Sequence, residues 1–117
     1  MHFVEQKHDD VWVLSIKGKL VDTPETDKLY AKVKAIIENE VKKIVIDLQH
    51  VSWIASVGIG VLLRCYTTIR NSGGDLRLTG LSEKVQNLFS ITKLTGIIQI
   101  HNSVAEAIKS YENKQSN

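Results

Sequence analysis

The segment Lys43-Ile44-Val45-Ile46-Asp47-Leu48 decides the fold, together with the segment Ser56-Val57-Gly58-Ile59-Gly60 that follows it. The first segment is almost continuously apolar and β-branched, which is typical of a strand buried on both faces in a parallel arrangement. From Ser56 onward, apolar residues recur with helical spacing until Asn71-Ser72-Gly73-Gly74 interrupts them. We therefore expect a central strand over 43–48, a connection over 49–55 and a helix that begins near Ser56.

The residues before this region predict a hairpin and a helix. Two apolar-rich runs, Phe3–Gln6 and Val11–Ile16, flank the turn residues His8-Asp9-Asp10, so they are expected to pair as an antiparallel hairpin. Thr23-Pro24-Glu25 then offers a capping hydroxyl, a proline suited to the first helical position and an acid that favours the positive end of the helix dipole. An amphipathic helix capped by Thr23 is therefore predicted.

The residues after the second helix predict two further strand–helix pairs. Leu76–Thr79 alternates like a short strand, and Ser82-Glu83 can cap a third helix. Ile97–Ile100 predicts a last strand, and the segment 103–106 fits a capping box that opens a final helix. The order is β-β-α-β-α-β-α-β-α, an α/β fold in which right-handed crossovers join the later strands to one sheet, with the hairpin at one side.

All 117 residues are expected to form one compact domain, a mixed β-sheet with an N-terminal hairpin and about four α-helices. The composition, 43% hydrophobic and 24% charged, is that of an ordinary globular protein, and no linker or repeat divides the chain. We expect the core to span about residues 2–112 and the tail 113–117 to fray.

Composition and charge exclude several classes of function. Cys65 is the only cysteine, which rules out an intramolecular disulfide or a multi-cysteine metal site, and its apolar neighbours predict a buried thiol. The net charge of +2 comes from lysines scattered among acids, so no nucleic-acid partner is expected. No apolar run approaches the roughly 20 residues of a membrane span, and the N-terminus lacks a secretory signal, so we expect a cytoplasmic protein.

The connection after the central strand is the first place to look for function, because ligands and reactive groups gather at the carboxyl ends of strands in α/β sheets. Ser56 at the helix start has two interpretations, an N-cap only or a hydroxyl that could carry a phosphate beside Gly58 and Gly60. A nucleotide loop is not predicted, since Leu63 occupies the third glycine position. Trp53 and Ile54 either plug the edge of the core or form an exposed partner-binding knob.

No catalytic, cofactor or metal site is predicted from the side chains. The four histidines lie apart in the sequence, and no acid or cysteine accompanies them at the spacing of a nucleophile or a metal site. Each histidine is expected to lie at the surface or at the end of a strand. A small flavodoxin-like enzyme or nucleotide binder rests on fold analogy alone, and the absent phosphate loop and catalytic cluster disfavour it.

Several motifs together resemble the STAS family, the bacterial anti-sigma factor antagonists, over residues 11–107. The family signature is a strand ending in Asp-Leu followed by a serine–glycine loop, and it is matched here by Asp47-Leu48 and the segment 54–60. The segments 73–78 and 85–89 also resemble the family's glycine pair, fourth strand and third helix. Ser56 matches the serine that is phosphorylated in the family. Ala55 and Val57 depart from it, replacing the usual acidic residue before that serine and the small residue after it.

The resemblance implies a switch in transcription regulation. Such proteins bind an anti-sigma factor serine kinase and release its sigma factor, lose that binding when the kinase phosphorylates the serine, here Ser56, and are restored by a metal-dependent phosphatase. They have no catalysis of their own. The implied partner interface comprises Asp22, Thr23, Trp53, Ala55, Ser56, Val57, Gly58 and Gly60. The alternative, motivated by Ala55 and Val57, is a constitutive adaptor that never accepts phosphate and acts as a scaffold in a signalling or envelope-maintenance complex.

Overall fold

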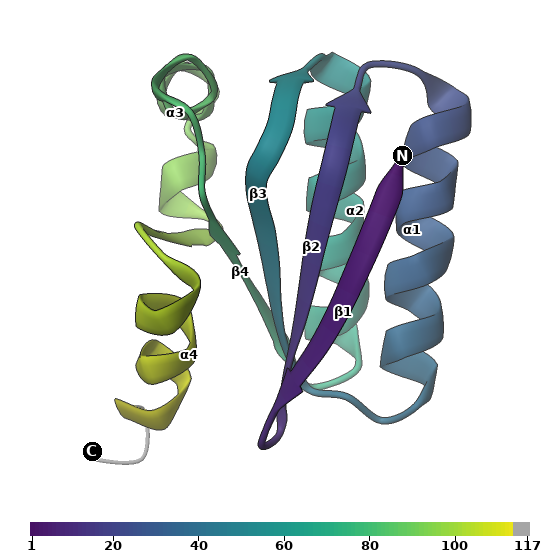
Figure 1. Cartoon of the computed structure of the whole chain (residues 1–117), viewed down its shortest axis with the longest axis vertical. Helices are drawn as coiled ribbons and strands as arrows, with labels where there is room; N and C mark the ends of the chain where they lie inside the picture. The colour runs from purple at the N-terminus through teal and green to yellow at the C-terminus, as the bar shows by residue number, and fades with distance from the viewer. Residues whose placement is uncertain (114–117) are drawn as a thin grey trace.

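The structure is a computed structural model that describes residues 1–113. The order of elements along the chain confirms the predicted α/β fold, with one added 3₁₀ turn, η1, before the last strand (Figure 1). The elements are β1 (His2–His8), β2 (Val11–Leu20), α1 (Thr23–Glu38), β3 (Lys43–Ile54), α2 (Ser56–Asn71), β4 (Asp75–Thr79), α3 (Glu83–Ile91), η1 (Leu94–Gly96), β5 (Gln99–His101) and α4 (Val104–Asn113).

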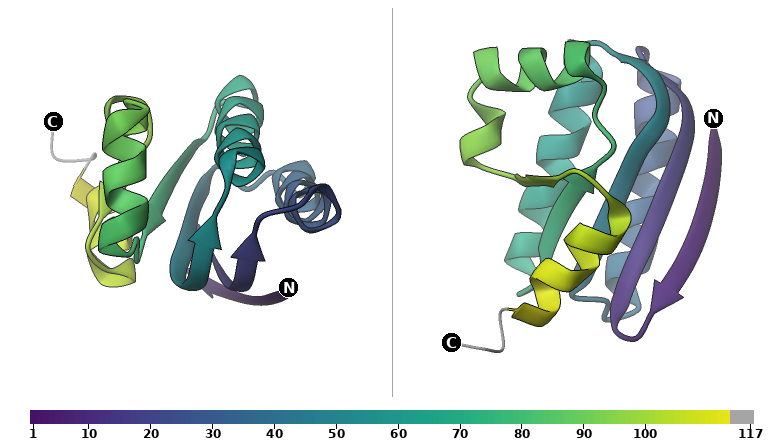
Figure 2. Two further views of the ribbon diagram at one scale, coloured as in Figure 1. Left: turned by 90° about the horizontal axis from the view of Figure 1, so that it is seen from above. Right: turned by 60° about the vertical axis from the view of Figure 1, so that its left-hand side comes forward.

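The five strands form one mixed sheet in the order β1-β2-β3-β4-β5. β1 and β2 pair antiparallel as the predicted hairpin, and all later neighbours pair in parallel. Helices α1 and α2 cover one face of the sheet, and α4 lies on the other (Figure 2). β3 is therefore the central strand, as its apolar sequence predicted.

The main core lies between the sheet and helices α1 and α2. Residues that alternate along β2 and β3, such as Leu14 and Ile46, point into it and meet Leu29 and Leu62 from the two helices. Cys65 is fully buried there as predicted, and burial raises the pKa of its thiol to about 12. Fully burying one such aliphatic side chain stabilises a fold by about 1.5–3 kcal/mol, so this layer supplies most of the driving force.

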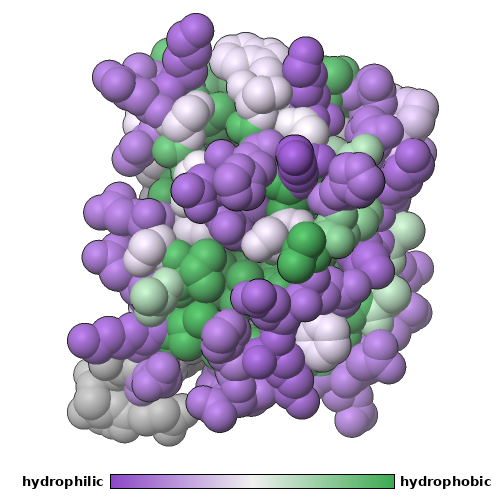
Figure 3. All heavy atoms as spheres, viewed as in Figure 1, coloured by the Kyte–Doolittle hydropathy of each residue, from purple (hydrophilic) through white to green (hydrophobic). Residues whose placement is uncertain are grey.

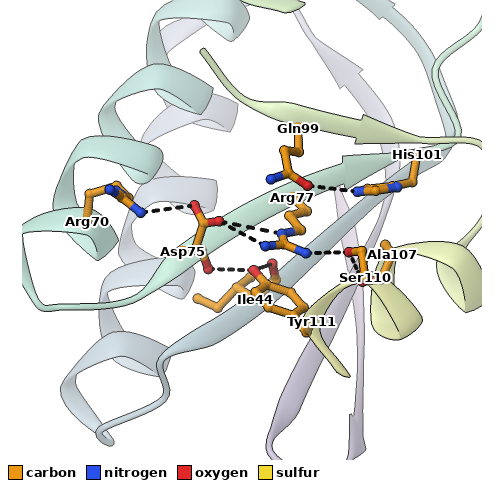
Figure 4. Close-up of polar contacts among 9 residues, drawn as sticks. All are labelled: Ile44, Arg70, Asp75, Arg77, Gln99, His101, Ala107, Ser110 and Tyr111. Atoms are coloured by element: carbon orange, nitrogen blue, oxygen red, sulfur yellow. Dashed lines mark hydrogen bonds and ion pairs between the residues drawn. The ribbon is translucent and has the colours of Figure 1, made fainter. Parts of the chain in front are cut away.

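A second, smaller core fixes α4 to the opposite face. The hydroxyl of Tyr111 lies 2.9 Å from the carbonyl oxygen of Ile44 and 2.7 Å from that of Asp75, and these two acceptors share its single proton (Figure 4). The guanidinium of Arg77 lies 3.9 Å above the Tyr111 ring and pairs with the Asp75 carboxylate at 3.4 Å. Burial raises the pKa of Tyr111 above its usual value, so the hydroxyl remains a hydrogen-bond donor.

Several sequence predictions differ from the structure at element ends, and both hairpin strands are longer than predicted, since β1 covers His2–His8 and β2 continues to Leu20. β3 does not stop at Leu48 but continues to Ile54, because the residues predicted as a connection pair with β2 across two register shifts. The predicted cap Thr23 is wrong, since the Asp22 carboxylate accepts the Glu25 amide at 3.0 Å and Thr23 is the first helical residue. The last strand covers 99–101 and not 97–100, because residues 97–98 follow directly on the 3₁₀ turn.

The C-terminal helix largely follows its prediction. The Ser103 hydroxyl accepts the Glu106 amide at 3.1 Å, which is one half of the predicted capping box. The Glu106 carboxylate reaches back to the amide of Asn102 at 3.2 Å, one residue earlier than the box requires. α4 ends at Asn113, and the remainder of the predicted frayed tail, 114–117, lies outside the described residues.

Candidate functional site

Ser56 is the first residue of α2, and its side chain is exposed. The N-cap position belongs to Ala55, which has extended backbone angles and no side chain able to cap. The N-cap interpretation of Ser56 is therefore wrong. Among residues 1–113 the Ser56 hydroxyl has no hydrogen-bond partner, so it is free to react or to meet another molecule.

The junction between β3 and α2 is held tightly against the end of β2. The Ala55 amide donates to the carbonyl of Leu20 at 2.9 Å, and the amides of Gly58 and Ile59 donate to the carbonyl of Ala55 at 2.9 and 3.1 Å. These bonds fix the first turn of α2 relative to the sheet. Ser56 therefore lies on a helix turn that is held in place by hydrogen bonds, and not on a flexible loop.

The two glycines that follow Ser56 have different roles. A Cβ atom at Gly58 would lie 2.5 Å from the Leu20 carbonyl oxygen and 2.7 Å from a methyl group of Ile54, so only glycine permits this approach. Gly58 is buried and contacts its own chain, which corrects its predicted place on the partner-facing surface. Gly60 is exposed, and a Cβ atom added there would meet nothing within 4 Å, so this glycine leaves open space beside Ser56.

The turn between β2 and α1 lies beside Ser56, because Leu20 and Ile54 are register partners at the ends of their strands. Asp22 and Thr23 are both exposed in this turn. The structure therefore brings together these two segments, which the sequence predicted as parts of one surface.

Several apolar side chains near Ser56 are exposed. Trp53 is 42% exposed, Val57 44% and Val21 38%, whereas Ile54 is completely buried. The core-plug interpretation therefore applies to Ile54 and not to Trp53. Val21 was not among the predicted surface residues. Its position directly before Asp22, the residue that caps α1, could have indicated from the sequence that it belongs to this surface. The Ser56 hydroxyl therefore lies on a surface that also exposes apolar side chains.

The start of α2 suits an anionic group on Ser56. The first turn of a helix leaves backbone amides without intrahelical partners, and the helix dipole places partial positive charge there. A phosphate at such a terminus is stabilised by both effects. The arrangement can thus hold a phosphorylated serine without unfolding the helix.

The described residues offer little for other chemistry. Within residues 1–113, no group of three or more His, Cys, Asp or Glu side chains is placed to hold a metal ion. No helix in the same range is long and apolar enough to cross a bilayer. The Asp47 carboxylate, part of the Asp-Leu motif, accepts the Gln49 amide at 3.0 Å and the hydroxyls of Ser15 and Thr79 at 3.4 Å each. It therefore shapes the bulge in β3.

Comparison with known proteins identifies the class. The chain matches the model of the STAS domain over residues 2–107, and it belongs to the STAS domain family. The anti-sigma-B factor antagonist of Bacillus subtilis is 34% identical over 97 residues, which cover 83% of this chain and 86% of that protein. The anti-sigma-B factor antagonist of Listeria monocytogenes is 41% identical over 61 residues, 52% of this chain and 54% of the relative, so this match spans about half of that protein's length.

Solved structures agree with the fold. A Thermotoga maritima protein, classed as a candidate anti-sigma factor antagonist, superposes with a TM-score of 0.86 at 28% identity and covers 92% of each chain. The phosphorylated form of the Bacillus cell fate determinant SpoIIAA superposes with a TM-score of 0.71 at 20% identity and covers 94% of this chain and 99% of that chain. At 20% identity, the similarity to SpoIIAA shows only that the two proteins share a fold.

Proposed function

We propose that this protein is an anti-sigma factor antagonist that binds an anti-sigma factor serine kinase, releases its sigma factor and is switched off when Ser56 is phosphorylated. The observation that carries the proposal is the exposed Ser56 hydroxyl at the start of α2, which has no hydrogen-bond partner in the described chain. The membership of the STAS family and the relatives named as anti-sigma-B factor antagonists support it.

The surface around the serine explains how a phosphate would act. We propose that unmodified Ser56 is buried against the partner together with the apolar side chains of Val21, Trp53 and Val57. Phosphorylation adds about −1.5 to −2 charges and three acceptor oxygens. Placing that charge in an apolar contact is strongly unfavourable unless the partner supplies matching cations. The free domain stays folded because the α2 amides stabilise the phosphate, so the change acts at the interface.

The remaining parts of the proposal follow from the same scheme. The protein is a substrate and a binding module without its own catalysis or cofactor, it acts in the cytoplasm, and a metal-dependent phosphatase restores it. Asp22, Thr23, Ala55 and Gly60 are proposed to complete the contact surface around Ser56. Gly58 contributes indirectly, since it lets α2 approach β2 closely enough to place the serine.

The test is phosphorylation in a purified system. The protein is incubated with an anti-sigma factor kinase of the same organism and ATP, and intact-mass analysis follows. We expect a gain of one phosphate in the wild type and in Ser52→Ala, and none in Ser56→Ala. Ser52 is the matched control, because it is also an exposed serine close to the start of α2. Phosphate on Ser52, or on both variants equally, would refute Ser56 as the acceptor.

A second function is favoured by the two residues that flank the serine. Ala55 and Val57 give the serine apolar neighbours in place of the acidic and small residues usual in the family, and Val57 is 44% exposed. A constitutive adaptor that binds its partner without ever being phosphorylated fits these neighbours. If the kinase and the protein bind each other but ATP leaves Ser56 unmodified, the adaptor replaces the switch.

A further inference from the structure

The face of the sheet opposite α1 and α2 carries a cluster of basic side chains at the carboxyl ends of its parallel strands. His2, Lys17 and His50 are register partners in one row across β1, β2 and β3, and Lys19 and Trp53 are register partners in a following row. All five side chains are exposed. We call these five residues the basic patch.

The register explains why these side chains share one face. Along β2, Leu14 and Ile16 point into the main core, so the odd-numbered Lys17 and Lys19 point to the opposite side. β3 advances by an extra residue at each of its two register shifts, which brings His50 and Trp53 opposite these lysines. The shifts therefore place His50 opposite Lys17 and Trp53 opposite Lys19 on this face.

The basic patch is neither covered nor neutralised by the described chain. α4 packs on the same face, but over Val11, Val13 and Val45 at the other end of the strands. Figure 3 views this face, where a group of hydrophobic residues lies at the lower left and hydrophilic residues surround the smaller apolar areas elsewhere. Within residues 1–113, no carboxylate forms an ion pair with Lys17 or Lys19.

Acidic side chains near the basic patch are already engaged. Asp47 lies on the same face one row below, but it is 9% exposed and accepts bonds from the Gln49 amide and from two hydroxyls. Asp22, on the neighbouring turn, accepts the amide of Glu25. The exposed cationic groups therefore have no internal counterpart on the described elements packed beside them.

We propose that the basic patch is a docking surface for an acidic segment of a partner protein, a segment that carries an apolar side chain for Trp53. The identity of the partner, an anti-sigma factor kinase, rests on the proposed function. Trp53 belongs to the basic patch and also borders the Ser56 surface, so the two surfaces are continuous. One partner can thus contact the serine with one part and extend an acidic segment over the open sheet. Charge complementarity of this kind speeds encounter and fixes register.

A protein segment fits the basic patch better than a nucleic acid does. Backbone recognition of nucleic acid uses a longer track of lysines and arginines that neutralises several phosphates. Here two lysines and two histidines occupy a compact area, and no arginine is among them. Exposed Val4, opposite Ser15 in the next row, adds apolar surface that suits a peptide side chain.

The first test uses defined probes and the intact ¹⁵N-labelled protein. The probes are a short synthetic peptide that mixes Glu and Asp with Leu and Phe, a single-stranded oligonucleotide of similar length and a peptide in which Lys replaces the acids. We expect the acidic peptide to shift the amide signals of Lys17, Lys19 and His50 and the Trp53 indole signal, and the shifts to shrink between about 50 mM and about 500 mM salt. Tighter binding of the oligonucleotide, or shifts elsewhere, would overturn the proposal.

The second test uses the anti-sigma factor kinase and charge reversal. Lys17→Glu combined with Lys19→Glu is expected to weaken binding on the order of tenfold at low salt, mainly through the association rate. Lys34→Glu combined with Lys93→Glu is the matched control, because both lysines are exposed outside the basic patch and neither forms an ion pair within residues 1–113. Unchanged binding by the first pair would refute the docking surface alone, whereas failure of the wild type to bind the kinase would refute the proposed function.

Discussion

The close approach of α2 to β2 makes a sharp prediction for Gly58→Ala. The added methyl group would lie 2.5 Å from the Leu20 carbonyl oxygen and 2.8 Å from the Leu20 Cβ, and these are atoms that cannot rotate away. The same carbonyl accepts the Ala55 amide at 2.9 Å, so α2 can move only by straining that bond. The variant should therefore be destabilised and should shift the turn that carries Ser56.

The magnitude follows from two opposing effects. Overpacking destabilises a fold by about 1–3 kcal/mol, and here we expect about 2–3 kcal/mol because the contacts are with atoms that cannot rotate away, while alanine recovers about 1 kcal/mol through its better helix propensity. The net loss in the free energy of unfolding should be about 1–2 kcal/mol, which lowers the melting temperature by roughly 4–8 °C in a domain of this size. Gly60→Ala is the matched control, since its Cβ meets nothing within 4 Å.

Urea and thermal unfolding followed by circular dichroism would measure both variants. Gly60→Ala should be neutral or more stable than the wild type by up to about 1 kcal/mol, because only the helix-propensity gain applies. If Gly58→Ala proves as stable as Gly60→Ala, the tight packing of α2 on the end of β2 is wrong. Ser56 would then lack the rigid support inferred for it.

Three further predictions concern α4, the core and β5. Tyr111→Phe removes the donor to the Ile44 carbonyl and should reduce the free energy of unfolding by about 1–2 kcal/mol in a urea titration, while an unchanged midpoint would contradict this anchoring. The Cys65 thiol, with its pKa raised to about 12 by burial, should react with a disulfide reagent at pH 8 only after unfolding. Burial, aided by the charge of Arg77, lowers the pKa of His101 below its ordinary 6.5, so protons bind the unfolded state more readily and stability should fall as the pH drops below about 6.5. His101→Gln should flatten that fall, and an identical pH profile would refute the assignment.

Much of the fold could be predicted because periodicity and burial agree along the central segment. The apolar run Lys43–Leu48 is the core of β3, and the helical spacing after Ser56 is α2. The extension of β3 to Ile54 could not be predicted, because it depends on pairing with β2 across two shifts in register. Local propensity contains no information about such long-range pairing.

The location of the site could be predicted from the sequence, but the roles and the exposure of its individual residues could not. The Ser56 motif marked the correct strand–helix junction, but the sequence left an N-cap role for Ser56 open, whereas Ala55 occupies the N-cap position in the structure. Gly58 and Gly60 look equivalent in the sequence, and only the three-dimensional contacts separate a packing glycine from an exposed one. The exposure of Trp53 likewise depends on which face of the bulged β3 it occupies.

Affinity for the anti-sigma factor kinase, measured by titration calorimetry for the wild type, Ser56→Ala and Ser56→Glu, tests the role of Ser56 most directly. Removing the hydroxyl should change the dissociation constant by less than about tenfold, because the Ser56 hydroxyl has no partner among residues 1–113 of the free protein and one neutral hydrogen bond contributes about 0.5–1.5 kcal/mol. Ser56→Glu should weaken binding by about a hundredfold or more, since it places an unpaired charge in the contact. Equal affinity of Ser56→Glu and the wild type would contradict the switch.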